Sequence, residues 1–338
     1  MTSPDHLSFC LAQVAFDLST PHGPVRLDGV GSALASFVQD VRIETQISDR
    51  IQISFHSGSI PDLSALTPVH RTHRLLTWYR SGSRLWLRWE HPLSPEAFWV
   101  AETNVEERQV EVYFSQEALA AQDSPPAGAL PGLSVAKGSG VPRAPARVIP
   151  LALFSTVWRF LAVLFLAPRQ GLLHHTAAAL FGGRMWLFPG RSGIGKSTLA
   201  RLLSGHPEFE VIGDDAAVTR CWDASPSTGG GYRAYGTPWP SSAGFAVAAA
   251  APLGGLLFLE QQPENRIEAL SPREAFHRLL PATNLLWWHP EWMPVMLEAC
   301  DRLTRSVPAW RFAFAPTPAA VELLAAFLKS RETPSTHP

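Results

Sequence analysis

Residues 185–203 read MWLFPGRSGIGKSTLARLL, and this stretch decides the fold. Residues 190–197 match the pattern G-x-x-x-x-G-K-[ST] at every position. The apolar residues before the glycines predict a strand, and residues 197–203 predict a helix. In such a loop, successive backbone N–H groups turn inward to bind an anion, and the helix adds the positive end of its dipole. The stretch therefore predicts a P-loop that binds the phosphates of a nucleoside triphosphate.

The side chains of this motif have distinct expected roles. Lys196 is expected to reach the β- and γ-phosphates, and the Ser197 hydroxyl is expected to ligate Mg²⁺. ATP and Mg²⁺ are thus the predicted cofactors. The predicted nucleotide-binding residues are Gly190, Arg191, Ser192, Gly193, Ile194, Gly195, Lys196, Ser197 and Thr198.

Two adjacent carboxylates, Asp214 and Asp215, follow the next apolar run at residues 209–212. We expect this run to be the strand beside the P-loop strand, so that both acids face the nucleotide crevice at the carboxyl edge of a parallel sheet. One carboxylate could then hold Mg²⁺, and the other could accept the proton of an attacking hydroxyl. The alternative is a turn with a helix N-cap, because Asp is common at both.

His174 and His175 lie just before the P-loop strand. Neighbouring side chains of an extended segment point to opposite faces, so only one of the two can face the phosphates. The other is expected to pack against the preceding apolar helix. Without further context, such histidines are more often core or surface residues than functional ones.

The pattern of the chain predicts two domains. Residues 1–119 contain period-2 alternation, for example at 50–55 and 109–114, which is typical of half-buried antiparallel strands in a β-rich accessory or substrate-presenting domain. Residues 120–147 are rich in Pro, Gly, Ala and Ser and predict a linker or long loop. Residues 148–330, where predicted strands and helices alternate, form the second domain.

The segment 148–167 is almost long and apolar enough to span a membrane, but it carries Arg159 near its middle and is bracketed by prolines. We therefore expect a buried core helix, with a membrane helix as the alternative. Apolar residues make up 46% of the chain and the net charge is -1, which argues against a nucleic-acid or anionic-membrane partner. Three scattered cysteines and an N-terminus without a signal-peptide pattern predict a cytoplasmic protein.

The ordered set of histidine, P-loop and aspartate pair resembles the catalytic domain of HPr kinase/phosphorylase and its bacterial relatives. The stretch LLHHTAAALFGGRMWLFPGRSGIGKSTLARLL and the later VIGDD carry this resemblance. It implies an α/β P-loop catalytic domain similar to phosphoenolpyruvate carboxykinase, here combined with the β-rich N-terminal domain. The family spacing to the P-loop lysine selects His175. The family also implies Asp215 as the base and Asp214 as the metal-side carboxylate, with the swapped pair as the alternative.

Later segments, YGTPWP at 235–240, PLGGLLFLEQ at 252–261 and SPREAFHRLL at 271–280, resemble relatives that act in peptide modification, including lasso-peptide kinases. Bona fide HPr kinases carry Glu where this chain has Thr198. The resemblance covers about residues 150–328 and implies a related serine kinase whose acceptor is not HPr.

Three functions follow from these observations. The first is a kinase that phosphorylates a Ser or Thr hydroxyl of a peptide or protein, with a precursor peptide among the candidates. The second is a small-metabolite kinase, and the third is a nucleotide-binding regulatory protein with little catalysis. The chain has neither an NKxD sequence nor an LSGGQ-like signature, and its acid pair is DD rather than DE, which favours a kinase over a GTPase or motor. Assembly into a homo-oligomer is compatible with all three.

Overall fold

The computed structural model describes residues 7–20, 26–28, 37, 49–72, 76–90, 97–115, 148–222 and 231–332. The chain divides into two compact units, residues 1–161 and 162–338, and the boundary falls inside helix α3 (Leu151–Leu166). The segment predicted as a linker, residues 120–147, lies outside the described residues.

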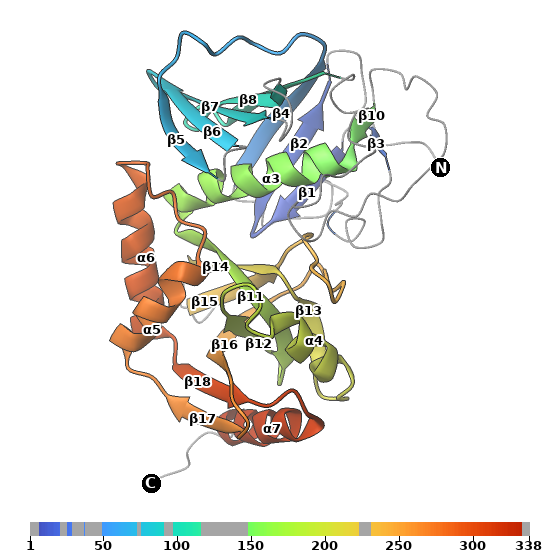
Figure 1. Ribbon diagram of the computed structural model, residues 1–338, viewed down its shortest axis with the longest axis vertical. Coiled ribbons are helices and arrows are strands. Elements are labelled where there is room, and N and C mark those ends of the chain that lie inside the picture. The colour runs from blue at the N-terminus through green and yellow to red at the C-terminus, as the bar shows by residue number, and fades with distance from the viewer. Residues whose placement is uncertain are drawn as a thin grey trace. The chain divides into compact units, whose positions relative to one another are not determined.

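Unit 1 is built on an eight-stranded sheet, with the strands in the order β1-β2-β4-β9-β8-β7-β6-β5 (Figure 1). A separate parallel pair is formed by β3 (Arg26–Asp28) and β10 (Val148–Pro150). The strands of the large sheet are β1 (Leu7–Leu11), β2 (Val14–Ser19), β4 (Asp49–Ser57), β5 (Pro68–Thr72), β6 (Leu76–Ser81), β7 (Arg84–Glu90), β8 (Ala97–Asn104) and β9 (Gln109–Phe114).

The expectation of antiparallel strands is wrong for β4. This strand runs parallel to both of its neighbours, β2 and β9, whereas the remaining pairs of the sheet are antiparallel. The alternation itself is confirmed, because Ile51, Ile53 and Phe55 are buried. A period of two reports that one face of a strand is buried, but it does not report the direction of the neighbouring strand.

The first part of α3 belongs to unit 1 and contributes to its core. Phe154 and Trp158 lie with their ring centroids 4.7 and 5.1 Å from that of Phe9, and Trp158 is also 5.8 Å from Phe16. The predicted core helix is therefore confirmed. Among the described residues, no helix has the length and apolar character needed to cross a membrane.

Unit 2 contains a second eight-stranded sheet, in the order β12-β11-β14-β15-β16-β18-β17, with β13 also paired to β11. The predicted alternation of strands and helices holds only in part, because β13 to β17 follow one another with no helix between them in the described residues. The expectation of a parallel sheet is wrong, because most pairs are antiparallel and only β12–β16 and β16–β18 are parallel. The strands are β11 (Gly171–Phe181), β12 (Arg184–Pro189), β13 (Glu210–Gly213), β14 (Ala216–Trp222), β15 (Gly231–Gly236), β16 (Ala250–Gln261), β17 (Arg266–Ala269) and β18 (Ala309–Phe314).

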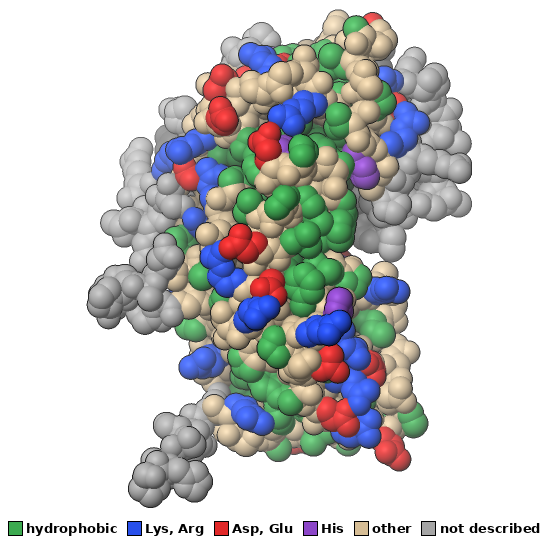
Figure 2. Space-filling view, turned by 90° about the vertical axis from the view of Figure 1, so that its left-hand side faces the viewer, with side chains coloured by type: hydrophobic (Ala, Val, Ile, Leu, Met, Phe, Trp, Pro, Cys, Tyr) green, Lys and Arg blue, Asp and Glu red, His purple; other side chains and the backbone are tan. Residues whose placement is uncertain are grey.

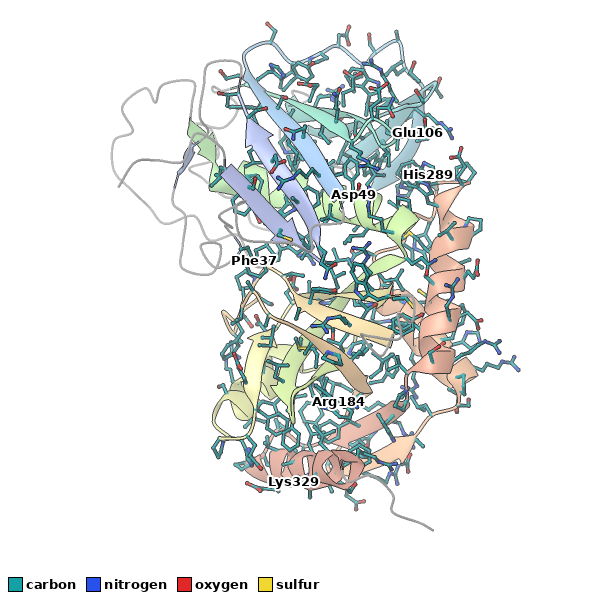
Figure 3. The ribbon with its side chains drawn as sticks, turned by 180° about the vertical axis from the view of Figure 1, so that it is seen from behind. Phe37, Asp49, Glu106, Arg184, His289 and Lys329 are labelled. Atoms are coloured by element: carbon teal, nitrogen blue, oxygen red, sulfur yellow. The ribbon has the colours of Figure 1, made fainter. Side chains whose placement is uncertain are left out.

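Two helices, α4 (Lys196–Ser204) and α7 (Pro318–Glu332), share a core with the strands of this sheet. The core includes Phe188, Leu199, Phe312 and Leu324. Lys329 lies on α7 (Figure 3). It forms an ion pair of 2.7 Å with Glu208.

The other two helices, α5 (Pro272–Leu279) and α6 (Trp292–Ser306), pack on each other, and short 3₁₀ turns lie at Ala167–Arg169 and Leu280–Ala282. The predicted capping box at Ser271 and Glu274 is present at the start of α5. Basic and acidic side chains intermix on the face of the molecule drawn in Figure 2. On α6, Arg305 and Asp301 form an ion pair of 2.7 Å.

Candidate functional site

Strand β11 brings the segments predicted as functional together. It pairs antiparallel with β12 on one side and with β13 and then β14 on the other. The expectation that β13 lies directly beside β12 is therefore wrong, because β11 lies between them. Since β12 and β13 both oppose β11, they run in the same direction and their carboxyl ends meet at the same level of the sheet.

Two backbone hydrogen bonds connect β11 to the segments that follow β12 and β13. The N–H of Gly190, which follows β12, donates to the carbonyl of His175 (3.2 Å). The N–H of Thr176 donates to the carbonyl of Asp215 (3.0 Å). Consecutive residues of β11 thus hold the start of the glycine loop (residues 190–195) on one side and the aspartate pair on the other.

The aspartate pair separates two strands, β13 and β14, that both pair with β11. Asp214 and Asp215 occupy the two positions between Gly213, the last residue of β13, and Ala216, the first of β14, and both strands pair with β11. The pairing with β11 shifts register at Ala178. The acids do follow an apolar strand, as predicted. The element after them is strand β14 and not a helix, so the alternative of a helix N-cap is wrong.

The glycine loop depends on backbone conformations that favour glycine. Gly193 and Gly195 have φ values of 82° and 108°, in the left-handed region. A Cβ atom at Gly195 would also lie 2.9 Å from the ring of Phe314 at the end of β18. The loop leads into α4, whose first N–H groups have no acceptor one turn earlier, as in any helix.

Lys196 is buried at the start of α4. Its Nζ donates to the carbonyls of Gly190 (2.9 Å) and Arg191 (2.8 Å). Burial lowers the pKa of Lys196 to about 8, while the negative charges of Asp215 and Asp214 act in the opposite direction. The lysine, the glycine loop and the two acids therefore belong to one electrostatic neighbourhood.

His175 is half-buried and contacts Asp215. Its Nδ1 lies 2.9 Å from the carbonyl oxygen and 3.2 Å from the Oδ1 of Asp215. A carbonyl can only accept, so Nδ1 carries a proton and donates in this contact. His175 is thus the histidine that shares a site with Asp215.

His174 is fully buried on the other face of β11. Its ring nitrogens lie 2.9 Å from the hydroxyl of Thr283 and 2.8 Å from that of Thr219. Burial lowers the pKa of His174 to about 3, so the ring is neutral at physiological pH. The polar partners of His174 are therefore two threonines, which the sequence did not predict, and its packing against the preceding helix stays a prediction.

Asp214 is fully buried, and its carboxylate accepts three backbone N–H groups from one later segment. Oδ1 accepts from Ser241 (2.9 Å) and Phe245 (3.3 Å), and Oδ2 accepts from Ala243 (2.8 Å). Sequence analysis missed this segment. The only signal was the preceding YGTPWP, which the resemblance includes without a role.

Ser197 and Thr198 lie in the first turn of α4 and are partly or fully exposed. Arg191 and Ser192 belong to the glycine loop before α4, and both are exposed. Gln261, at the end of β16, donates to the carbonyl of Gly193 in this loop (3.4 Å). Sequence analysis did not single out Gln261, because nothing local distinguishes it from any other polar residue after a strand.

In the described part of the chain, no three His, Cys, Asp or Glu side chains cluster in a way that could hold a metal ion by themselves. A surface groove of about 330 Å³ lies between α5 and α6 and contains none of the predicted site residues. Its lining residues are Ser271, Pro272, Arg273, Phe276, Asp301 and Arg305.

No protein-family model matches the chain, and no curated protein sequence matches it either.

Proposed function

We propose that this chain is an ATP- and Mg²⁺-dependent kinase that transfers the γ-phosphoryl group to a Ser or Thr hydroxyl of a peptide or protein. Its second unit is proposed to be an α/β P-loop catalytic domain of the HPr-kinase type. One observation carries the proposal: adjacent residues of β11 hydrogen-bond to the glycine loop on one side and to Asp215 on the other. A phosphate-binding loop and a candidate base thus flank the same strand.

The residues fit a nucleotide. Left-handed glycines at 193 and 195 allow the close backbone approach that a phosphate nest requires, and α4 supplies a helix N-terminus at the end of the loop. Lys196 hydrogen-bonds to two loop carbonyls and can exchange them for phosphate oxygens, which are stronger acceptors.

The residues also fit Mg²⁺, which keeps several water ligands and usually takes only one or two protein groups besides the phosphates. The Ser197 hydroxyl would supply such a group, and phosphate oxygens and water would supply the remaining ligands. When bound, the ion would neutralise part of the phosphate charge. Few protein ligands are needed, so the lack of a three-residue cluster among the described residues does not conflict with this role.

The proposed chemistry is an in-line displacement. The acceptor oxygen forms a bond to the γ-phosphorus, the bond from that phosphorus to the β–γ bridging oxygen breaks, and ADP leaves. Asp215 accepts the hydroxyl proton, and His175 orients Asp215 through its Nδ1–H. Lys196 stabilises the charge on the phosphates.

The test is phosphoryl transfer from Mg-ATP to Ser- and Thr-containing peptides, compared with the same peptides carrying Ala at those positions. Lys196→Ala should weaken ATP binding, because it removes a charge-assisted contact worth about 1.5–3 kcal/mol. Asp215→Asn keeps the side-chain shape but removes the base, so the rate should fall roughly 10²–10⁴-fold while ATP binding persists.

The outcomes separate the three functions. Transfer to the hydroxyl peptides alone supports the proposal. Transfer only to small hydroxyl compounds would make the chain a metabolite kinase, and tight ATP binding without any turnover would make it a regulatory protein. Unchanged binding and turnover in Lys196→Ala would refute the P-loop assignment itself.

A further inference from the structure

Asp214 has an environment unlike that of its neighbour. Its side chain is fully buried, and both of its oxygens accept backbone N–H groups, from Ser241, Ala243 and Phe245 at 2.8–3.3 Å. Asp215, one residue later, turns its carboxylate toward His175 instead. The two adjacent carboxylates therefore lie in different environments.

The three amides belong to one segment, residues 240–247, which we call the anchored loop. Its end is tied to β13, because the N–H of Val247 donates to the carbonyl of Ile212 (2.9 Å) and Ala246 forms an isolated bridge with Gly213. Its middle is tied to α4, because Arg201 donates to the carbonyl of Ser242 (2.6 Å). The loop thus connects the aspartate pair with the helix that follows the glycine loop.

The apolar side chains of the anchored loop support the same arrangement. Ala243 and Phe245 pack against the core that contains Leu199 and Leu203 of α4. The loop is therefore held both by the Asp214 carboxylate and by packing against this core.

A metal-ligand role does not suit Asp214. A carboxylate has about four acceptor positions, and three are occupied by N–H groups. Recruiting its oxygens to Mg²⁺ would take the acceptors away from three backbone N–H groups of half-buried residues, which is costly. The side chain is also inaccessible to solvent, whereas Mg²⁺ retains several waters.

We propose that Asp214 is a positioning residue that locks the anchored loop and thereby fixes Asp215, and that it does not ligate Mg²⁺. The backbone carbonyl of Asp215 is held separately, because it accepts from the N–H of Thr176 (3.0 Å) and from Nδ1 of His175 (2.9 Å). The backbone of the pair is thus held from two directions, and the Asp215 carboxylate keeps its place beside His175. This inference rests on the proposed kinase function for its effect on the rate, but the anchoring itself does not.

The first experiment uses the unaltered protein. Hydrogen exchange across residues 240–247 is measured without ligand, with Mg²⁺ alone and with Mg-ATP. An anchoring carboxylate keeps its three amides protected under all three conditions. Faster exchange of these amides on addition of Mg²⁺ or Mg-ATP would overturn the proposal, because it would show that the carboxylate leaves them for the ion.

The second experiment compares Asp214→Asn with Asp215→Asn as its matched control. An asparagine at 214 places an NH₂ group against backbone donors, so exchange across 240–247 should accelerate at least tenfold. The transfer rate should fall about 10- to 100-fold, with the Mg²⁺ concentration for half-maximal rate unchanged within twofold. Asp215→Asn should lose the rate but keep the slow exchange of the loop.

A tenfold higher Mg²⁺ requirement in Asp214→Asn, with the loop still protected, would identify Asp214 as a metal ligand. Arg201→Ala removes only the exposed hydrogen bond to Ser242, so this variant should stay folded. Its loop amides should exchange faster than in the unaltered protein, and its transfer rate should fall less than that of Asp214→Asn. Should the unaltered protein neither bind nor turn over ATP, the proposed function fails, and the exchange data still decide whether Asp214 anchors the loop.

Discussion

The adjacent histidines have different environments because they differ by one position along β11. Successive side chains of β11 point to opposite faces, so His174 enters the core between Thr219 and Thr283 while His175 reaches Asp215. His174 is a hydrogen-bonded core residue whose loss would leave the buried Thr219 hydroxyl to find a new partner, whereas Thr283 keeps its hydrogen bond to the carbonyl of Leu279. His175 is only partly buried and contributes its Nδ1–H to the candidate base.

Matched alanine variants should separate these roles. His174→Ala should lower the free energy of unfolding by about 1–3 kcal/mol, because it breaks two buried hydrogen bonds, and it should leave phosphoryl transfer nearly unchanged. His175→Ala should reduce transfer roughly 10²-fold with little effect on stability. Chemical denaturation and the transfer assay measure the two effects, and the reverse pattern would show that the site assignment is one residue out of register.

The same pair gives a pH readout. The folded protein keeps His174 neutral down to about pH 3, whereas in the unfolded chain this side chain takes up a proton near its ordinary pKa of about 6.5. Between these values the unfolded state binds more protons, so the contribution of His174 to stability is present above pH 6.5 and is lost as the pH falls. His174→Ala should lack this contribution, and His175→Ala should keep it.

Lys196 predicts a pH dependence of nucleotide binding. Burial lowers its pKa to about 8, so the free protein loses this charge at a pH where an exposed lysine would keep it. Phosphate favours the protonated amine, so the Kd for Mg-ATP should rise about tenfold per pH unit above pH 8, until the higher pKa of the bound lysine is reached.

Isothermal titration between pH 7.5 and 9.5 measures this dependence, and binding near pH 8 should be accompanied by proton uptake. Lys196→Arg is the control, because a guanidinium stays charged throughout this range and its profile should be flat. A Kd for the unaltered protein that stays constant up to pH 9.5 would contradict this prediction, because no titration of Lys196 would then be linked to binding in this range.

At the scale of elements, local patterns predicted what local physics determines. The apolar alternation located β4 and β9, the capping box located the start of α5, and the glycine motif located the loop between β12 and α4. Each depends on residues only a few positions apart, through burial of one face, side-chain capping or backbone conformation.

Which strands lie side by side depends on residues far apart in the chain. The sequence predicted less of this strand pairing than of the individual elements. The parallel neighbours of β4 and the insertion of β11 between β12 and β13 leave no mark on the local alternation. The same holds for Asp214, whose three donors come from 27 to 31 residues later in the chain. The motif marked both acids as candidates, but only the long-range contacts distinguish their environments.

At the scale of the whole molecule, the two units have separate sheets. The predicted nucleotide site consists entirely of residues of unit 2, from His175 to Asp215. A ligand that binds only the folded form of a unit stabilises that unit by mass action, by about 2.7 kcal/mol at a concentration 100 times its Kd. Mg-ATP should therefore stabilise unit 2 and leave unit 1 almost unaffected.

Hydrogen exchange during thermal or denaturant unfolding measures each unit in the same sample. We expect slower exchange in the strands β11, β12 and β13 when Mg-ATP is present, and no change in β4, β8 and β9. In Lys196→Ala the effect on unit 2 should shrink, because the weaker phosphate contact raises the Kd and so reduces the stabilisation at a fixed ATP concentration. Equal protection of both units would mean that the nucleotide also stabilises unit 1, and protection confined to unit 1 would show that the nucleotide binds to residues outside the predicted site.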